Sequence, residues 1–202
     1  MTSPPPLDSD LLALGAATAA TAEHFLSTTR EVAAGANPDV AIPLLLLAVS
    51  DLVTAGARLG AITDVVPAEQ FEPDDGPDPD LEPLRLSLAN VLDGLDAYSE
   101  VIDPVLSPRT GTARLSDDLT DIGTALAVGL QHHRAGRPDE ALWWWQYSYL
   151  SSWGERAASA ARVLLGVIAH LRLDVDDDVA AEAEFDALHP AVPDTRDARG
   201  TD

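Results

Sequence analysis

The sequence predicts an all-α protein, a helical bundle of five to six helices built from two αα-hairpins plus a middle helix. Apolar residues recur at three- and four-residue steps over most of the chain, and no segment alternates with a period of two for long enough to predict a strand. A turn pattern also occurs twice, because residues 34–41 and 135–141 both read Ala-Gly, a short gap and Pro-Asp-x-Ala. Glycine ends a helix in a left-handed turn and proline restarts the next, so each copy predicts an αα-hairpin.

The first hairpin is expected to join two helices. The first helix begins near residues 8–10, which offer an N-cap, and ends at Gly35. The second runs from Pro38 to about Gly60, and its polar stripe consists of Asp51, Thr54 and Arg58. A helix that is apolar on most sides belongs in the middle of a bundle.

The middle helix and the second hairpin complete the predicted bundle. A third helix is expected over 81–102, followed by a loop over 103–114. Ser116 is expected to cap a fourth helix, which Gly136 closes. Pro138 then opens a long helical region that reaches about Leu173 and is bent or broken near Gly154.

Charge is concentrated outside the helical body. The 202 residues include 34 acidic side chains and 12 basic ones, all of them arginine, for a net charge of −22. We therefore expect a disordered head over 1–7, one helical domain over 8–173 with an acidic loop over 63–80, and an acidic, mostly disordered tail over 174–202. A chain this acidic repels phosphate backbones, which excludes nucleic-acid binding by direct electrostatics.

Several other function classes lack support in the sequence. The absence of cysteine excludes disulfides and thiolate chemistry, and the first residues lack the basic and apolar regions of a signal peptide. The most apolar run, 41–49, is shorter than the roughly 20 residues that span a bilayer. We expect a cytoplasmic protein without a membrane partner.

Residues 140–153 hold all four tryptophans, and a helical projection separates them into two faces. A wide apolar arc contains Trp143, Trp145, Tyr147 and Trp153, and these rings are expected to pack in the core. The narrow polar face carries Glu140, Ser148, Ser151 and Glu155, and it also includes Trp144. That indole is either a half-covered surface residue or a contact anchor for a partner.

Gln146 falls within the aromatic arc, so its amide needs partners if it is buried. Either tyrosine hydroxyls or a backbone carbonyl satisfy it, or it faces a ligand in an aromatic pocket. Such a pocket would be formed by Trp143, Gln146, Tyr147 and His133, the last of which lies on the apolar seam of the fourth helix.

Motifs for catalysis or metal binding are lacking. No helix carries His-x-x-x-His, and there is no P-loop and no Gly-x-Ser-x-Gly. A metal site would need His24, His133 and His170 to converge from different helices. We therefore expect no enzyme activity, no cofactor and no metal.

Several segments resemble one known family. They are the Trp-rich helix 141–154, the Leu-Ser-Asp-Asp-Leu run at 115–119, residues 133–136, and the shorter motifs at 64–67 and 71–74. Over about residues 10–173 the chain is similar to an actinobacterial family of unknown function. The resemblance implies a small all-α cytoplasmic protein of bacteria and assigns no catalytic or binding residue.

The preferred hypothesis is a non-enzymatic helical domain that binds another protein. Trp144, Glu140 and Glu155 are its candidate contacts, together with the acidic loop. The alternative is a bundle that binds a small molecule in the aromatic pocket. The sequence leaves the partner, the ligand and the oligomeric state open.

Overall fold

The computed structural model describes residues 8–67, 79–103 and 107–173. It divides the chain into two units, Met1–Gly166 and Val167–Asp202, so the boundary falls inside the last helix and before the expected end of the domain at 173. The expected head, the expected tail and most of the acidic loop lie outside the described residues. The fold described below is that of the first unit.

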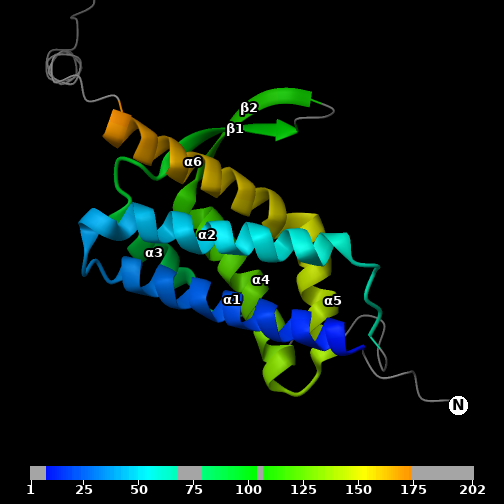
Figure 1. Ribbon diagram of the computed structural model, residues 1–202. Helices are drawn as coiled ribbons and strands as arrows, with labels where there is room; N and C mark the ends of the chain where they lie inside the picture. The colour runs from blue at the N-terminus through cyan, green and yellow to red at the C-terminus, as the bar shows by residue number, and fades with distance from the viewer. Residues whose placement is uncertain (1–7, 68–78, 104–106, 174–202) are drawn as a thin grey trace, which may run out of the picture. The chain divides into compact units, whose positions relative to one another are not determined.

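Helices dominate the described part of the chain (Figure 1). In chain order the elements are α1 (Ser9–Ala33), α2 (Pro38–Ala61), α3 (Glu82–Val91), β1 (Ala97–Asp103), β2 (Ser107–Arg114), α4 (Leu115–Arg134), α5 (Pro138–Ser148), the π-helical turn η1 (Tyr149–Trp153) and α6 (Gly154–Leu173). Because α5, η1 and α6 follow one another without a gap, they form one helical path. The expectation of a mostly helical bundle is confirmed.

Both predicted αα-hairpins are present. Gly35 and Gly136 have φ of 68° and 75°, the left-handed conformation that ends a helix, and Pro38 and Pro138 open the helices that follow. α1 packs along α2, and α4 packs against α5 and α1. Their shared core is aliphatic with a few large rings, among them Phe25, Trp145 and Trp153.

The prediction of no strands is wrong for residues 97–114. β1 and β2 pair antiparallel, with Ala97 opposite Arg114 and Val101 opposite Thr110. The predicted third helix stops at Val91, and Gly94, with φ of 83°, lies in the turn before β1. These strands hold few apolar residues and do not form part of the main core, so the alternation that marks a half-buried strand is weak in them.

α2 is the one helix in the described ranges that is long and apolar enough to cross a membrane by length and composition. Its most apolar window has a mean hydropathy of 2.0. The apolar run 41–49, which is too short to span a bilayer, is therefore part of a longer apolar helix. The core helix of a water-soluble protein passes the same test, and α2 packs against α1 and α5. The predicted polar stripe of Asp51, Thr54 and Arg58 is exposed on its outer face.

The predicted break near Gly154 takes the form of the π turn η1. A Cβ on Gly154 would lie 2.6 Å from the carbonyl oxygen of Tyr149, so glycine permits this wider turn. The extra residue rotates the side chains of α6 relative to those of α5. Trp153 is thereby buried against α2, where a Cβ on Gly56 would lie 2.9 Å from its Cη2 atom.

Candidate functional site

The tryptophan helix is buried on one side and exposed on the other. Trp145 and Trp153 are fully buried, as predicted, whereas Trp143 and Trp144 are half-buried. Tyr147 is 55% exposed and Leu150 is 64% exposed. The tryptophan helix therefore presents aromatic surface to solvent through several side chains, and Trp144 is the half-covered surface residue that one of the two sequence alternatives described.

Consecutive indoles attach α5 to α4. Trp144 Nε1 donates a hydrogen bond of 2.7 Å to the carbonyl oxygen of Ala125, and Trp145 Nε1 donates one of 3.3 Å to that of Leu126. Gly129 makes the second contact possible, because a Cβ at that position would overlap the Trp145 indole. The Trp144 ring thus leans on α4 and does not project freely into solvent.

Gln146 has a structural role, because its amide bonds to backbone groups, which is one of the alternatives predicted from the sequence. Its Oε1 accepts a hydrogen bond of 2.8 Å from the amide of Val65, and its Nε2 donates to the carbonyl oxygen of Leu59 at 3.0 Å. Longer contacts of Nε2 reach the carbonyl oxygens of Ile62 and Thr63. The amide therefore fixes the end of α2 and the segment that follows it.

The two-face assignment is wrong at Glu140, Ser148 and Tyr147. Glu140 and Ser148 are buried, although both were placed on the polar face, and Tyr147 is exposed, although it was placed in the core arc. The reason is that buried polar groups find partners: Ser148 Oγ donates to the carbonyl of Trp144 and accepts from Trp153 Nε1. A projection that sorts residues by polarity alone misses such pairs.

A buried ion-pair cluster lies in the α4–α5 hairpin. Glu140 Oε2 lies 2.9 Å from Nδ1 of His132 and 2.6 Å from Nη1 of Arg137. The apolar seam predicted for the fourth helix is therefore wrong at its last residue only, since His132 is 1% exposed and His133 is half-buried beside Trp145. The other ring nitrogen of His132, Nε2, has no hydrogen-bond partner.

The half-buried rings of Trp143 and Trp144 and the exposed Tyr147 of α5, together with the exposed Leu150 of η1, make up a surface that we call the aromatic face of α5. The rings of Trp143 and Tyr147 are stacked, with centroids 5.6 Å apart and planes inclined by 6°. Trp144 is tilted against both rings, at 6.1 Å and 6.4 Å. The stacked pair thus adds an exposed phenol to a largely apolar surface.

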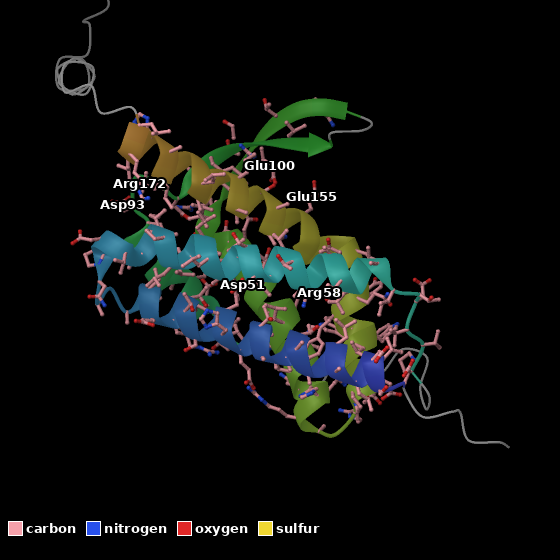
Figure 2. All side chains as sticks on the ribbon, viewed as in Figure 1. Asp51, Arg58, Asp93, Glu100, Glu155 and Arg172 are labelled. Carbon is pink, nitrogen blue, oxygen red and sulfur yellow. The ribbon has the colours of Figure 1, made fainter. Side chains whose placement is uncertain are left out.

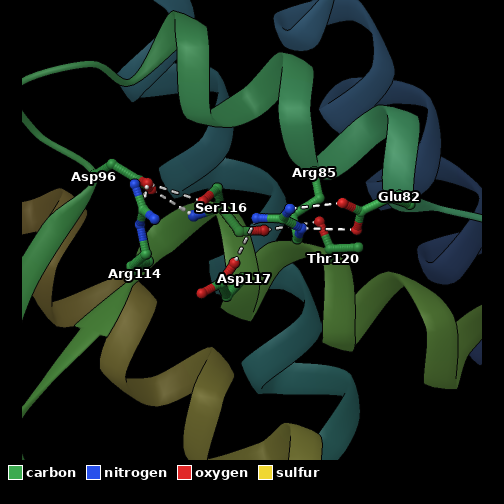
Figure 3. Close-up of polar contacts among 7 residues, drawn as sticks. All are labelled: Glu82, Arg85, Asp96, Arg114, Ser116, Asp117 and Thr120. Carbon is green, nitrogen blue, oxygen red and sulfur yellow. Dashed lines mark hydrogen bonds and ion pairs between the residues drawn. The ribbon is translucent and has the colours of Figure 1, made fainter.

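Polar contacts also gather where the β-hairpin meets the start of α4 (Figure 3). The buried carboxylate of Asp96 accepts hydrogen bonds from the amide and the hydroxyl of Ser116 and pairs with Arg114. The expectation that Ser116 caps α4 is therefore wrong, because Asp96 supplies the acceptor from outside the helix. Next to this cluster, Arg85 of α3 bridges Glu82 and Asp117.

A second buried acid joins β1, α4 and α6. Asp118 accepts a hydrogen bond from the hydroxyl of Tyr98 and pairs with Arg156 at 2.9 Å. Burial raises the pKa of the Asp118 carboxyl above its ordinary 3.8, although the hydrogen bonds from Tyr98 and Arg156 act in the opposite direction. Burial is also the main reason why the pKa of Tyr98 is raised, and its bond to Asp118 adds to the shift.

The remaining predicted site residues are His24, Glu155 and His170. His24 and Glu155 are exposed, Glu155 on α6, and His170 belongs to the second unit. Within the described ranges no group of three or more His, Asp or Glu side chains could hold a metal ion. Sequence reasoning missed His132, Asp118 and the hairpin residues, whose contacts cross between elements and leave no spacing signal.

The features above define a class of protein: a helical bundle with an appended β-hairpin, whose buried acids are all engaged in structural contacts. Residues 12–170 match the family DUF5063, a domain of unknown function, and the chain belongs to this family. Its fold resembles the crystal structure of protein BF1032 from Bacteroides fragilis, with a TM-score of 0.56 and 18% sequence identity. The match covers 78% of this chain and 89% of that chain, and at this identity it concerns the fold alone. A comparison with curated proteins finds no match.

Proposed function

We propose that this domain is a non-enzymatic interaction module that binds another protein through the aromatic face of α5. On the resemblance noted above, it acts in the cytoplasm of an actinobacterium. One observation carries the proposal: Tyr147 is more than half exposed and stacked on Trp143, and Leu150, in the turn that follows α5, is also more than half exposed. Tyrosine and tryptophan are enriched at the centres of protein interfaces because they bury large areas and lose little side-chain entropy.

The contacts differ from those expected on sequence grounds. The carboxylate of Glu140 pairs with His132 and Arg137, so it stabilises the α4–α5 hairpin. Trp144 lies at the side of the aromatic face, since its indole nitrogen is bonded to α4. Tyr147 and Leu150 become the principal candidates, and Trp143 stacks on Tyr147.

A protein partner fits this region better than a small molecule. The ligand hypothesis relied on the Gln146 amide as the polar group of an aromatic pocket. Both ends of that amide are bonded to the backbone between Leu59 and Val65. If the Gln146 amide bonded a ligand instead, these buried backbone groups would lose their partners, at a cost of about 1–3 kcal/mol each.

The buried acids support the non-enzymatic reading. Asp96, Asp118 and Glu140 each pair with an arginine and with at least one further hydrogen-bonding side chain. A general acid or base needs access to a reacting proton. These three carboxylates instead form contacts that hold parts of the fold together.

The proposal is tested by photo-crosslinking in cells that express the chain natively. A benzoylphenylalanine replaces Tyr147 in one variant and Leu165 in the other, because Leu165 on α6 is exposed to a similar extent, 58%. We expect a discrete heterologous product from position 147 that is absent from position 165 and is lost with Leu150→Asp. The same products from both positions, or none from position 147, would contradict the proposal.

A further inference from the structure

A second surface lies away from α5, between the β-hairpin and α6 in the first unit. A groove of about 500 Å³ opens there, within the range of sites that hold small ligands or short peptides. Ser99, Glu100 and Val101 of β1 and Thr110 of β2 form one wall, and Glu155, Ala158, Ser159 and Arg162 of α6 form the other. Figure 2 shows Glu100 and Glu155 in the space between the hairpin and α6.

The backbone of β1 offers an unpaired edge to this groove. The amide of Leu115 donates to the carbonyl oxygen of Asp96, the residue before β1. In the register of the two strands this bond continues the ladder, so the residues of β1 that are bonded to β2 are every second one after Asp96, namely Tyr98 and Glu100. The N–H and C=O groups of Ser99 and Val101 therefore point away from β2. The carbonyl oxygen of Ser99 accepts a 3.3 Å hydrogen bond from Arg162, which places this edge on the α6 side.

Such an edge can accept another strand. Within the described ranges the sheet has two strands, so no described strand lies beyond this edge of β1. An unpaired row of backbone donors and acceptors is a template for an extended chain, and peptides commonly add to a sheet edge that borders a helix-lined groove. The carbonyl oxygen of Ser99 accepts its long hydrogen bond from the exposed Arg162, and an incoming amide can replace this donor.

The charge of the groove selects the sign of the occupant. Glu155 is exposed, and Glu100 accepts a 2.7 Å hydrogen bond from Ser159 on one oxygen, which leaves its second oxygen available. Arg162 is the one cation among the lining residues. The groove is thus net acidic, within a chain whose net charge is −22, and it favours basic side chains.

We propose that this groove binds an extended, basic peptide segment, which pairs with the outer edge of β1 and places an arginine or lysine between Glu100 and Glu155. The backbone pairing supplies affinity, and the two carboxylates select the charge. The groove and the aromatic face of α5 share no residue. A substitution in one surface therefore tests that surface and leaves the residues of the other unchanged.

The test uses a fluorescent seven-residue peptide with alternating valine and arginine. A second peptide has the same sequence with N-methyl groups on alternate amides, so it keeps the charge but cannot pair along one edge. A third carries glutamate in place of arginine. Anisotropy titrations with the full chain are expected to give at least about tenfold tighter binding for the first peptide than for either of the others.

Matched variants locate the site. Ala158→Trp fills the groove and is expected to abolish binding, whereas Ala20→Trp, at an exposed position on α1, is expected to leave it unchanged. Glu155→Gln is expected to weaken binding about threefold or more, and Asp51→Asn, an equal charge change on the exposed face of α2, is not. Amide NMR shifts are expected at Ser99 and Val101.

Four results would each overturn the proposal. Equal binding of the N-methylated peptide would mean that general attraction to an acidic chain explains the affinity. Tighter binding of the glutamate peptide would contradict the charge assignment. Failure of the arginine peptide to bind, or unchanged binding to Ala158→Trp, would show that the groove is not a peptide site.

Discussion

The indole nitrogen of Trp145 occupies the space in which a side chain at position 129 would begin. Gly129 lies in α4, and its lack of a Cβ lets the two helices approach until Trp145 Nε1 reaches the carbonyl oxygen of Leu126. Trp144 makes the parallel contact with Ala125 one residue earlier. The α4–α5 interface thus depends on one missing methyl group, and the position of the exposed aromatic face depends on that interface.

Gly129→Ala tests this dependence directly. The added Cβ overlaps the Trp145 indole, and overpacking of this kind costs about 3 kcal/mol of the free energy of unfolding. Urea denaturation measures the loss. Gly166→Ala is the control, because a Cβ there meets open space on a helix and is expected to stabilise by about 0.5–1 kcal/mol. Similar small effects at both positions would contradict the close packing described.

Truncation of the three neighbouring aromatic rings is expected to give graded losses. Trp145→Ala empties a fully buried site and is expected to cost about 3–5 kcal/mol. Trp144→Phe removes the hydrogen bond to Ala125, worth about 1 kcal/mol, together with part of a half-buried ring, and Tyr147→Ala is expected to stay below about 1 kcal/mol. Thermal and urea unfolding give the order, and a loss at Tyr147 as large as that at Trp145 would refute it.

Gln146→Leu is expected to release the segment after α2. The variant keeps the side-chain volume but leaves the amide of Val65 and the carbonyl oxygen of Leu59 without their partner, at a cost of about 3 kcal/mol. Hydrogen exchange of the Val65 amide should accelerate beyond the change in global stability. Ser151→Ala, on the exposed side of the same helical path, is the control. Unaltered protection of Val65 would show that the amide does not hold this segment.

Asp118 is expected to make stability fall as pH rises above 3.8. Its pKa is raised in the folded protein, so between the unfolded value and the folded value the native state binds more protons than the unfolded state. The free energy of unfolding therefore decreases with pH across that window, and Asp118→Asn removes this contribution. Urea denaturation of both proteins across the window measures the difference.

The same titration has a second readout in Tyr98. The phenol donates to the Asp118 carboxylate and lowers its pKa, so Tyr98→Phe is expected to raise that pKa further. Carboxyl-carbon NMR of Asp118 follows the midpoint in both proteins. A midpoint at or below the ordinary value in the wild type, or a downward shift in the variant, would contradict the described burial.

The sequence determined the helical class, the two αα-hairpins and the ends of the long helices. These features follow from local rules, since glycine at Gly35 and Gly136 and proline at Pro38 and Pro138 act on the backbone whatever surrounds them. It also showed that Gln146 needs hydrogen-bond partners if it is buried, because an amide in an aromatic arc cannot remain unsatisfied. The family membership rests on the sequence as well.

Only the tertiary structure decided which face of the tryptophan helix is exposed and that residues 97–114 form a hairpin. Polarity failed as a guide to burial because Glu140 and Ser148 gain partners from other positions in the fold, which offset the cost of removing them from water. The sequence did not predict the β-hairpin, because single contacts such as that of Tyr98 with Asp118 hold it in place rather than an apolar stripe. Contacts between distant residues carry no periodic signal, and the groove between β1 and α6 arises from them.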